Sequence, residues 1–354
     1  MRHPSAEPVA PDHVVRPRRS WRDPRTRALA SQAAVVAAVC AIVVMVAMQT
    51  AANLRARDIA SGFDYLGRAA GFEIAQGGLS YSSRDTYARA LEAGLVNTLR
   101  VAAIGIAVAS ALGLLVGIAR LSPIWIVSAT SNVYVEVLRN TPLLLQLLFW
   151  YSLSQALPRP HDALNPLPGV FLSGRGLFLP RLVWHGGWLQ FGRVALERPE
   201  LAGFGFRGGT SISPEFAALL VGLSTYTSAF IGEIVRGGIL AVDRGQTEAA
   251  AALGLSRLRI LRLVVLPQAL PVIVPPTTSQ FLNLAKNSSL AVAIGYPDVI
   301  SITNTTLNQT GQAIEAIAIA MVLYLAISLA ISFPMNLWGG AVVARARGRE
   351  GGGC

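Results

Sequence analysis

The chain has 354 residues, of which 53% are hydrophobic and only 14% are charged, and its formal net charge is +11. A soluble domain carries about 25% charged residues, so this composition excludes an ordinary soluble globular protein and indicates an integral membrane protein. Lys286 is the only lysine, and the many arginines stand in blocks beside apolar segments, which is typical of membrane proteins rather than of nucleic-acid-binding proteins.

Six segments are long and apolar enough to be membrane-spanning helices, which need about 20 mostly apolar residues. They are residues 28–50, 96–118, 134–157, 215–235, 269–294 and 313–337. The third and fifth contain prolines, which membrane bundles tolerate because neighbouring helices satisfy the freed backbone groups. The sequence therefore predicts an all-α integral membrane protein with about six transmembrane helices. The alternative for 28–50 is a cleavable signal peptide, but its apolar run exceeds the usual 7–15 residues.

The distribution of arginines predicts the orientation. The tail 1–27 contains seven arginines and three acids, so the positive-inside rule places it in the cytoplasm. Six spans then place the basic loop 241–267 and the tail 341–354 in the cytoplasm as well, and the loops 51–93 and 158–213 outside. The loop 158–213 has more arginines than acids, against the rule, but long loops translocate largely regardless of charge.

The residues that common catalytic and metal sites need are missing from the sequence. A phosphate-binding loop of the G-x-x-x-x-G-K-[ST] type requires a lysine after glycine, whereas Lys286 follows Ala285. The four histidines have no metal-ligand spacing, and Cys40 and Cys354 suggest no disulfide framework. We therefore expect no enzyme activity, metal or cofactor in this chain.

The loop 241–267 contains an alanine-rich segment that begins at Glu248. Alanine is the best helix former and leaves a narrow helix, Thr247 can cap its start, and Gly254 suits a left-handed turn at its end. A second short helix fits 256–266, and Pro267 marks the return to the membrane. The sequence predicts a small-faced helix that a soluble partner receives in a groove. The alternative is an ordinary interfacial helix.

This segment resembles the signature loop of the permease subunits of bacterial ABC importers, EAA, three residues, G, nine residues, I-x-L-P. The matching residues are Glu248, Ala249, Ala250, Gly254, Val264, Leu266 and Pro267, with Val264 where the family usually has isoleucine. The resemblance implies the type I ABC importer permease architecture. It also implies that this loop, residues 241–267, is the coupling helix that docks on an ATPase subunit.

Other segments resemble the permeases for polar amino acids, within the general L-amino-acid permease branch. They are residues 63–83, 134–146, 233–237, 281–295 and 305–312, and the resemblance covers about residues 55–340. It implies a transmembrane domain over 94–340, in a multi-pass protein of the bacterial inner membrane. The implied partners are an ATPase dimer that binds the ATP, a second, related permease, and a periplasmic binding protein that delivers an amino acid.

Charged residues inside spans are expensive and are candidates for function. Glu136 and Arg139, and likewise Glu233 and Arg236, stand three positions apart and can pair on one helix face. Arg100 can extend to the outer surface. For each of the two pairs, the alternative to a gating or coupling role is an ion pair at the end of a span.

Two groups of polar residues are candidates for the substrate pathway. Lys286 and its neighbours offer donors that suit an amino-acid carboxylate, and the alternative for Lys286 is a salt bridge to another helix. These neighbours are Asn283, Asn287, Ser288 and Ser289. The weaker group comprises Asn140, Thr141 and Gln146, where Thr141-Pro142 can start a broken helix that directs N–H groups at an anion. The alternative there is a plain kink.

The loop 158–213 is rich in glycine, proline and aromatic residues. It is either an aromatic layer at the outer membrane interface or a docking surface for an external partner. Its aromatic residues are Phe171, Phe178, Trp184, Trp188, Phe191, Phe204 and Phe206.

Rival functions for the whole chain are a permease for a different small polar solute, an ion-coupled secondary carrier and a membrane scaffold that recruits a soluble enzyme.

Overall fold

The computed structural model describes residues 24–56, 61–74, 77–185, 193–203 and 205–350. Its contacts divide the chain into two units, Met1–Ser61 and Gly62–Cys354, which are described separately here. Most of the predicted tail 1–27 lies outside the described residues, as does the end of the tail 341–354.

The first unit contains helix α1 (Pro24–Ala56). Its stretch Arg27–Thr50 is long and apolar enough to cross a membrane, and none of that stretch is buried against protein. A helix that is apolar all round needs lipid or another apolar surface around it. The helix therefore fits the first predicted span, residues 28–50.

In the second unit, four more helical segments of the described chain are long and apolar enough to cross a membrane. They are α2 (Tyr87–Ala119), α5 (Pro214–Leu240), the helical run Arg257–Ile294 and most of α10 (Ala313–Glu350). These segments contain the predicted spans 96–118, 215–235, 269–294 and 313–337. The mostly helical membrane fold expected from the sequence is thus confirmed.

The predicted span 134–157 is interrupted at Thr141-Pro142, as the broken helix considered for this site requires, and it is not a single helix with a plain kink. The chain forms α3 (Trp125–Asn140) and α4 (Leu143–Gln155), separated by Thr141 and Pro142. Thr141 is extended, with φ −96° and ψ 129°, because the ring of a following proline disfavours helical backbone. Neither helix reaches the length of a full span.

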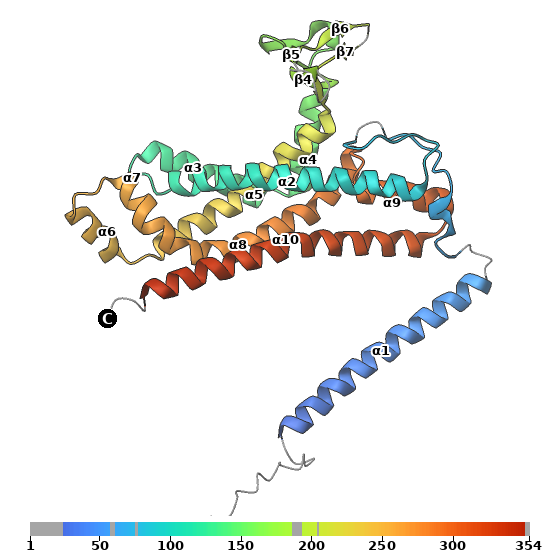
Figure 1. Ribbon diagram of the computed structural model, residues 1–354, viewed down its shortest axis with the longest axis horizontal. Helices are drawn as coiled ribbons and strands as arrows, with labels where there is room; N and C mark the ends of the chain where they lie inside the picture. Colours follow the sequence, from blue (N-terminus) through green and yellow to red (C-terminus); the bar gives the residue numbers. More distant parts are fainter. Residues whose placement is uncertain (1–23, 57–60, 75–76, 186–192, 204, 351–354) are drawn as a thin grey trace, which may run out of the picture. The chain divides into compact units, whose positions relative to one another are not determined.

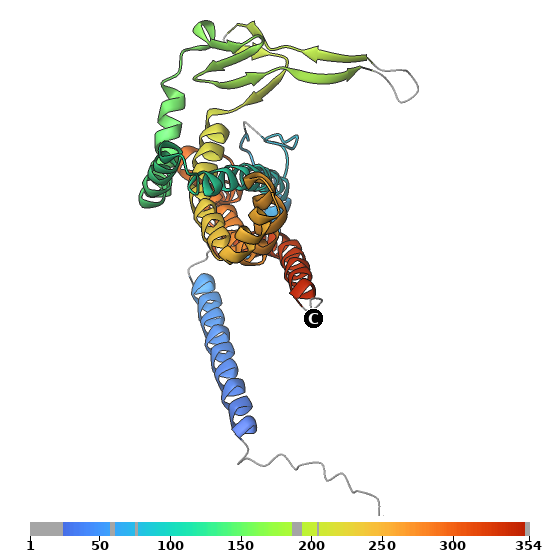
Figure 2. The ribbon, with the colours of Figure 1, turned by 90° about the vertical axis from the view of Figure 1, so that its left-hand side faces the viewer.

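Helices α2 and α5 pack closely because small residues lie between them. A Cβ atom on Gly113 would stand 2.6 Å from the Cβ of Ile231, and one on Gly117 would stand 2.7 Å from the Cβ of Val235. Figures 1 and 2 show the two helices side by side over much of their length. Glycines that admit a facing backbone are a common means of joining helices in membranes.

The fifth span belongs to a helical run without a loop. It starts with α7 (Arg257–Ile260), passes through the π-helix η3 (Leu261–Val265) into α8 (Leu266–Asn287), and ends in the 3₁₀-helix η4 (Ser288–Ile294). Helix α8 contains Pro271, Pro275 and Pro276. After η4 the chain forms the short helix α9 (Val299–Thr310) before α10 begins.

The segment before α2 folds against the start of α2 and against α9. It contains the 3₁₀-helix η1 (Asp64–Gly67), whose Tyr65 is fully buried in a small apolar cluster with Tyr87 and Ile302. The Tyr87 hydroxyl group donates to Gln309 Oε1 at 2.8 Å, and the Gly62 N–H donates to Glu315 Oε1 at 2.8 Å.

The loop between α4 and α5 forms a small β-structure, which the sequence did not predict. After the 3₁₀-helix η2 (Pro160–Asp162), an antiparallel sheet of order β1-β2-β3-β8 and two hairpins, β4-β5 and β6-β7, extend from the helices (Figure 2). The strands are β1 (Leu164–Leu167), β2 (Val170–Ser173), β3 (Gly176–Leu179), β4 (Arg181–His185), β5 (Arg193–Glu197), β6 (Glu200–Ala202), β7 (Gly205–Arg207) and β8 (Thr210–Ile212).

Three of the aromatic residues in this loop pack on one another. The Phe206 ring lies 4.7 Å from that of Phe171 and 4.6 Å from that of Phe178, centroid to centroid. These three rings therefore pack on one another within the β-structure, where Phe178 is buried and Phe171 and Phe206 are half-buried. The side chains of Trp184, Trp188, Phe191 and Phe204 lie outside those that the structure describes.

Candidate functional site

The segment between α5 and α8 contains a short helix, α6 (Arg244–Ala252), with a defined start and end. Asp243 caps its start, because Oδ1 accepts the Gly245 N–H at 2.6 Å. The sequence prediction that Thr247 caps the helix is wrong, since Thr247 lies one turn inside it.

The end of α6 matches the sequence prediction. Gly254 has φ +78°, a left-handed conformation that glycine adopts without steric cost. The Gly254 N–H donates to Ala251 O at 2.9 Å, and the Leu255 N–H donates to Ala250 O at 3.3 Å. These two bonds form a Schellman motif, which reverses the chain immediately after the helix.

A small apolar cluster joins this short helix to the rest of the molecule. Ala250, Ile260 and Val265 form its buried centre, and Ile239 and Val242 from α5 and the following turn pack against them. Gln268 Nε2, on α8, also donates to Gln246 Oε1 of α6 at 3.5 Å. Only one residue of α6, Ala250, is buried. The helix is therefore anchored through one face and presents the others to solvent.

The exposed faces contain acidic, small and apolar side chains. Glu248 and Ala249 are exposed, and Leu253 and Leu258 are 82% and 74% exposed. Two leucines so open to water at one tip are typical of a surface that another protein covers. Of the sequence-predicted residues, Val264, Leu266 and Pro267 are half-buried in the helical run that leads into α8, on which α6 rests.

One face of α8 stays uncovered along its whole length. Its buried residues pack toward α2, α5 and α10, whereas a stripe at helical spacing is exposed. The exposed stripe consists of Gln268, Val272, Pro275, Ser279, Asn283 and Lys286. Among the described residues Lys286 has no hydrogen bond or ion pair. Polar side chains on a spanning helix avoid lipid, so this face is suited to a water-filled path or to a second subunit.

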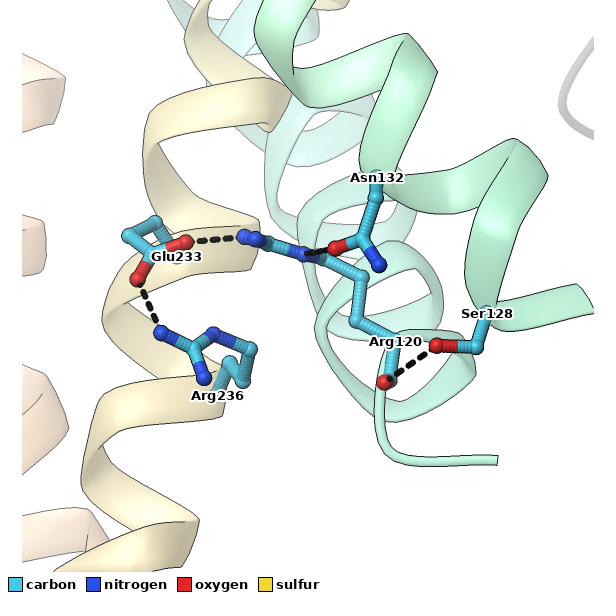
Figure 3. A network of polar contacts seen from close by, with 5 residues as sticks. All are labelled: Arg120, Ser128, Asn132, Glu233 and Arg236. Atoms are coloured by element: carbon cyan, nitrogen blue, oxygen red, sulfur yellow. Dashed lines mark hydrogen bonds and ion pairs between the residues drawn. The ribbon is translucent and has the colours of Figure 1, made fainter. Parts of the chain in front are cut away.

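A charged network joins α2, α3 and α5 near the end of α2 (Figure 3). Glu233 binds Arg236 at 2.7 Å, which confirms the predicted pair, and its other oxygen binds Arg120. Arg120 Nε donates to Asn132 Oδ1 at 2.6 Å. One carboxylate thus serves two guanidinium groups from different helices. Sequence reasoning missed Arg120, which follows directly after the predicted second span, because no local spacing relates it to Glu233.

The other predicted ion pair is wrong. Glu136 and Arg139 make no ion pair in the described structure, and both are exposed. The Arg139 guanidinium carbon lies 4.9 Å from the ring centroid of Phe230 instead. This cation–π contact joins α3 to α5 and leaves the Glu136 carboxylate free on the surface of the described chain.

The remaining predicted residues fall into two groups. Gln146 lies buried at the α3–α4 break, where its Nε2 donates to Leu138 O at 2.9 Å and to Thr141 O at 3.0 Å. Ser288 is buried, and its hydroxyl donates to Ala285 O. Gln146 and Ser288 therefore bind backbone carbonyl groups. The second group is accessible to solvent: Asn140 is exposed, and Thr141, Asn287 and Ser289 are half-buried.

Sequence reasoning also gave no role to Asp298, which caps α9 and is 1% exposed. Oδ1 accepts the Ser301 N–H at 2.8 Å, and Oδ2 accepts from the Tyr324 hydroxyl at 3.2 Å. Burial raises the pKa of the Asp298 carboxyl to about 6, although these hydrogen bonds favour the ionised form.

Among the described residues, no cluster of His, Cys, Asp and Glu could hold a metal ion.

The sequence is similar to that of known transport proteins over most of its length. Residues 109–348 match the family described as "Binding-protein-dependent transport system inner membrane component". The chain is 40% identical to the general L-amino acid transport system permease protein AapQ of Rhizobium johnstonii, over 92% of this chain and 94% of that protein. It is 36% identical to the glutamate/glutamine/aspartate/asparagine transport system permease protein BztB of Rhodobacter capsulatus, over 92% and 96%.

A solved structure has a similar fold. The crystal structure of an amino acid ABC transporter with histidines superposes with a TM-score of 0.51 at 26% identity. The match covers 72% of this chain and 95% of that one. The chain therefore shares its fold with nearly the whole of that transporter chain.

Proposed function

The chain belongs to the binding-protein-dependent transport system inner membrane components and is an amino-acid permease subunit of an ABC transporter. We propose that its loop 241–267 couples it to a separate ATPase and that polar residues of α8 contact the amino acid. The relatives with 36–40% identity over almost their whole length support this assignment. The alternatives of an ion-coupled carrier and of a recruiting scaffold gain no support from these relatives.

The way in which α6 is anchored and exposed supports the proposal that it couples the chain to the ATPase. This segment is a nine-residue helix held by one buried alanine, closed by a left-handed glycine and bordered by Leu253 and Leu258, which are open to water. Such a helix can fill a groove in a soluble subunit. The proposed contact residues are Glu248 and Ala249 on α6 and Leu253 directly after it, and Gly254, Val264, Leu266 and Pro267 support them. The ATP is bound and hydrolysed in that ATPase subunit.

The exposed stripe on α8 supports the pathway proposal. We assign Lys286 and Asn283 to contact with the carboxylate of the amino acid, because the ammonium and amide groups are donors and have no partner in the described chain. A related second permease subunit would face this stripe and close the path. The orientation predicted from the arginines places both termini and the loop 241–267 in the cytoplasm, and it requires α3 and α4 to make one crossing together.

The β-structure supports an external partner, the periplasmic binding protein. A groove with about 710 Å³ of empty space lies at its base, and Arg159, His161 and Arg175 line it. The hairpin β4-β5 also carries the exposed cross-strand leucines Leu182 and Leu196. A basic groove beside exposed apolar residues suits an acidic protein surface.

Reconstitution tests the function. The chain with its partner permease is placed in vesicles together with the binding protein, with or without the ATPase subunit, and uptake of radiolabelled L-glutamine is followed. We expect uptake only with ATPase and ATP. Uptake driven by an ion gradient without the ATPase would favour a secondary carrier, and ATPase recruitment without any uptake of a panel of amino acids would favour a scaffold.

A further inference from the structure

A small polar hollow lies where four segments meet at the outer end of α2. It has about 240 Å³ of empty space, including its open mouth. Its lining comes from α2, from strand β8 and the start of α5, and from the residue that follows η4 and Gly295. The lining residues used below are Asn97, Arg100, Ser211, Ser213, Phe216 and Tyr296.

The only basic side chain in this lining is that of Arg100. Its guanidinium carbon lies 4.9 Å from the ring centroid of Phe216, so the group lies over that ring. In the described chain Arg100 forms no ion pair, and Glu215, next to Phe216, does not approach it closely enough to make one. The cation is therefore positioned by an aromatic ring and is not neutralised.

Arg100 differs in this respect from the arginines of the α2–α5 network. Arg120 and Arg236 share Glu233, so each of these two guanidinium groups contacts a carboxylate inside the protein. A charged group on a spanning helix normally has a counter-charge or faces water. Arg100 is exposed and lines the hollow, so its guanidinium faces water and its N–H donors are accessible to an anion.

Nearby groups add donors and give the hollow its shape. The Ser213 hydroxyl oxygen accepts the Phe216 N–H at 3.0 Å, so its own hydrogen is free to donate, and Ser211 is exposed at the rim. Asn97 is held by its own bonds: Nδ2 donates to Pro297 O at 2.9 Å, and its backbone oxygen accepts from Tyr296. These contacts fix the lining before a ligand arrives.

We propose that this hollow binds the carboxylate group of an amino acid that enters from outside, through Arg100 and the hydroxyl groups of Ser211 and Ser213. A guanidinium presents two N–H groups to one carboxylate, so a single arginine can bind that group with two parallel hydrogen bonds. The cation also repels the α-ammonium group, which then points to the open mouth. This inference rests on the proposed function for the identity of the ligand.

Protection of Arg100 from phenylglyoxal, a reagent specific for arginine, tests the site without transport. The full chain in phosphatidylcholine vesicles is labelled with acetate, L-glutamine or L-glutaminamide present, and peptide mass spectrometry measures the modification at each arginine. We expect acetate and L-glutamine to lower labelling of Arg100, by about threefold at twice the Kd, because occupancy follows 1 + [L]/Kd. L-Glutaminamide lacks the carboxylate and should give no protection.

Arg89 is the matched control, because it lies on the same helix and pairs with Glu92 at 2.7 Å, outside the hollow. Its labelling should not change with any ligand. Equal labelling of Arg100 under all conditions would overturn the proposal. Protection by phosphatidylglycerol vesicles without added carboxylate would also overturn it, since the anion would then be a lipid phosphate.

A second measurement uses uptake by the reconstituted complex. Arg100→Gln should raise the KM for L-glutamine more than it lowers kcat, and Arg100→Lys should restore part of the loss by keeping the charge. An unchanged KM in Arg100→Gln would contradict the assignment. If the wild-type complex shows no ATP-dependent uptake, the proposed function fails, whereas the labelling experiment still decides whether the hollow binds a carboxylate.

Discussion

Glu233 in α5 binds Arg120 at the end of α2, a residue 113 positions earlier in the chain. The same carboxylate binds Arg236 one turn further along α5. Two cations therefore depend on one anion, and its loss leaves both unpaired. Since the side chains are only about one-tenth to one-third exposed, this network contributes more to stability than an ion pair on the open surface.

Glu233→Gln should lower the free energy of unfolding by about 1–3 kcal/mol, a range below the cost of breaking a fully buried pair. Thermal unfolding of the purified chain in detergent measures the change. Arg89→Gln is the control, because the Arg89–Glu92 pair is exposed and should be worth less than about 1 kcal/mol. Equal changes in the two variants would show that the α2–α5 network contributes no more to the free energy of unfolding than the exposed Arg89–Glu92 pair.

Gly254→Asp should abolish ATP-dependent uptake, because a side chain at φ +78° strains the turn and places a charge on the proposed docking surface. Gly254→Ala, which adds only strain of about 1–2 kcal/mol, should have an intermediate effect. Gly237→Ala is the control: this glycine is helical, and a Cβ there meets nothing within 4 Å. Undiminished uptake in Gly254→Asp would exclude the coupling role.

Gly117→Ala should separate α2 from α5. Its Cβ would stand 2.7 Å from the Cβ of Val235 and 2.8 Å from the Gly232 carbonyl oxygen, so one of the helices must move. We expect a loss of about 1–3 kcal/mol, as for other overpacked cores. Gly340→Ala, in open space on α10, should be neutral or slightly stabilising, and a similar loss there would argue against the packing explanation.

Stability should depend on pH through Asp298. Its folded-state pKa of about 6 is above the unfolded value, so the folded protein binds this proton more tightly. The stability that this carboxyl contributes is greatest below about pH 4, falls between about pH 4 and pH 6, and is constant above. The unfolding free energy of the wild type relative to Asp298→Asn should therefore decrease by about 2 kcal/mol between pH 4.5 and pH 7.

Unfolding midpoints of both proteins at pH 4.5 and pH 7 measure this difference. The comparison cancels the groups that titrate in both proteins. A difference that stays constant with pH, or that grows in favour of the wild type at pH 7, would contradict the assignment to Asp298.

Lys286→Ala should weaken substrate handling by the complex, because it removes the cation from the exposed stripe of α8. We expect a lower rate of L-glutamine uptake with little change in thermal stability, since Lys286 has no partner in the described chain. Lys286→Arg keeps the charge and should retain more activity. Normal transport kinetics in Lys286→Ala would remove this residue from the pathway.

Local patterns in the sequence were sufficient for several of these features. Apolar length predicted the spanning helices, and the φ preference of glycine predicted the turn at Gly254. The Glu233–Arg236 pair followed from helical spacing. These features depend on residues within a few positions of one another, and a single sequence shows them directly.

Features that depend on distant contacts did not follow from the sequence. No spacing relates Arg120 to Glu233, and the ring of Phe230 competes for Arg139 only after α3 and α5 are packed. The loop 158–213 forms strands of three to five residues, too short for their alternation to be recognised between so many glycines and prolines. The aromatic side chains were visible, but their mutual stacking was not.

The helical run Arg257–Ile294 has a mechanical consequence. Its α-helical part α8 has 22 residues and is about 33 Å long at 1.5 Å per residue. The cluster that anchors α6 lies at the start of the run, and Lys286 lies near its other end. Pro271, Pro275 and Pro276 lie between them, and each removes a backbone donor. The helical run can therefore bend at these prolines. A small displacement of the part that packs against α6 can thus tilt the part that contains Lys286.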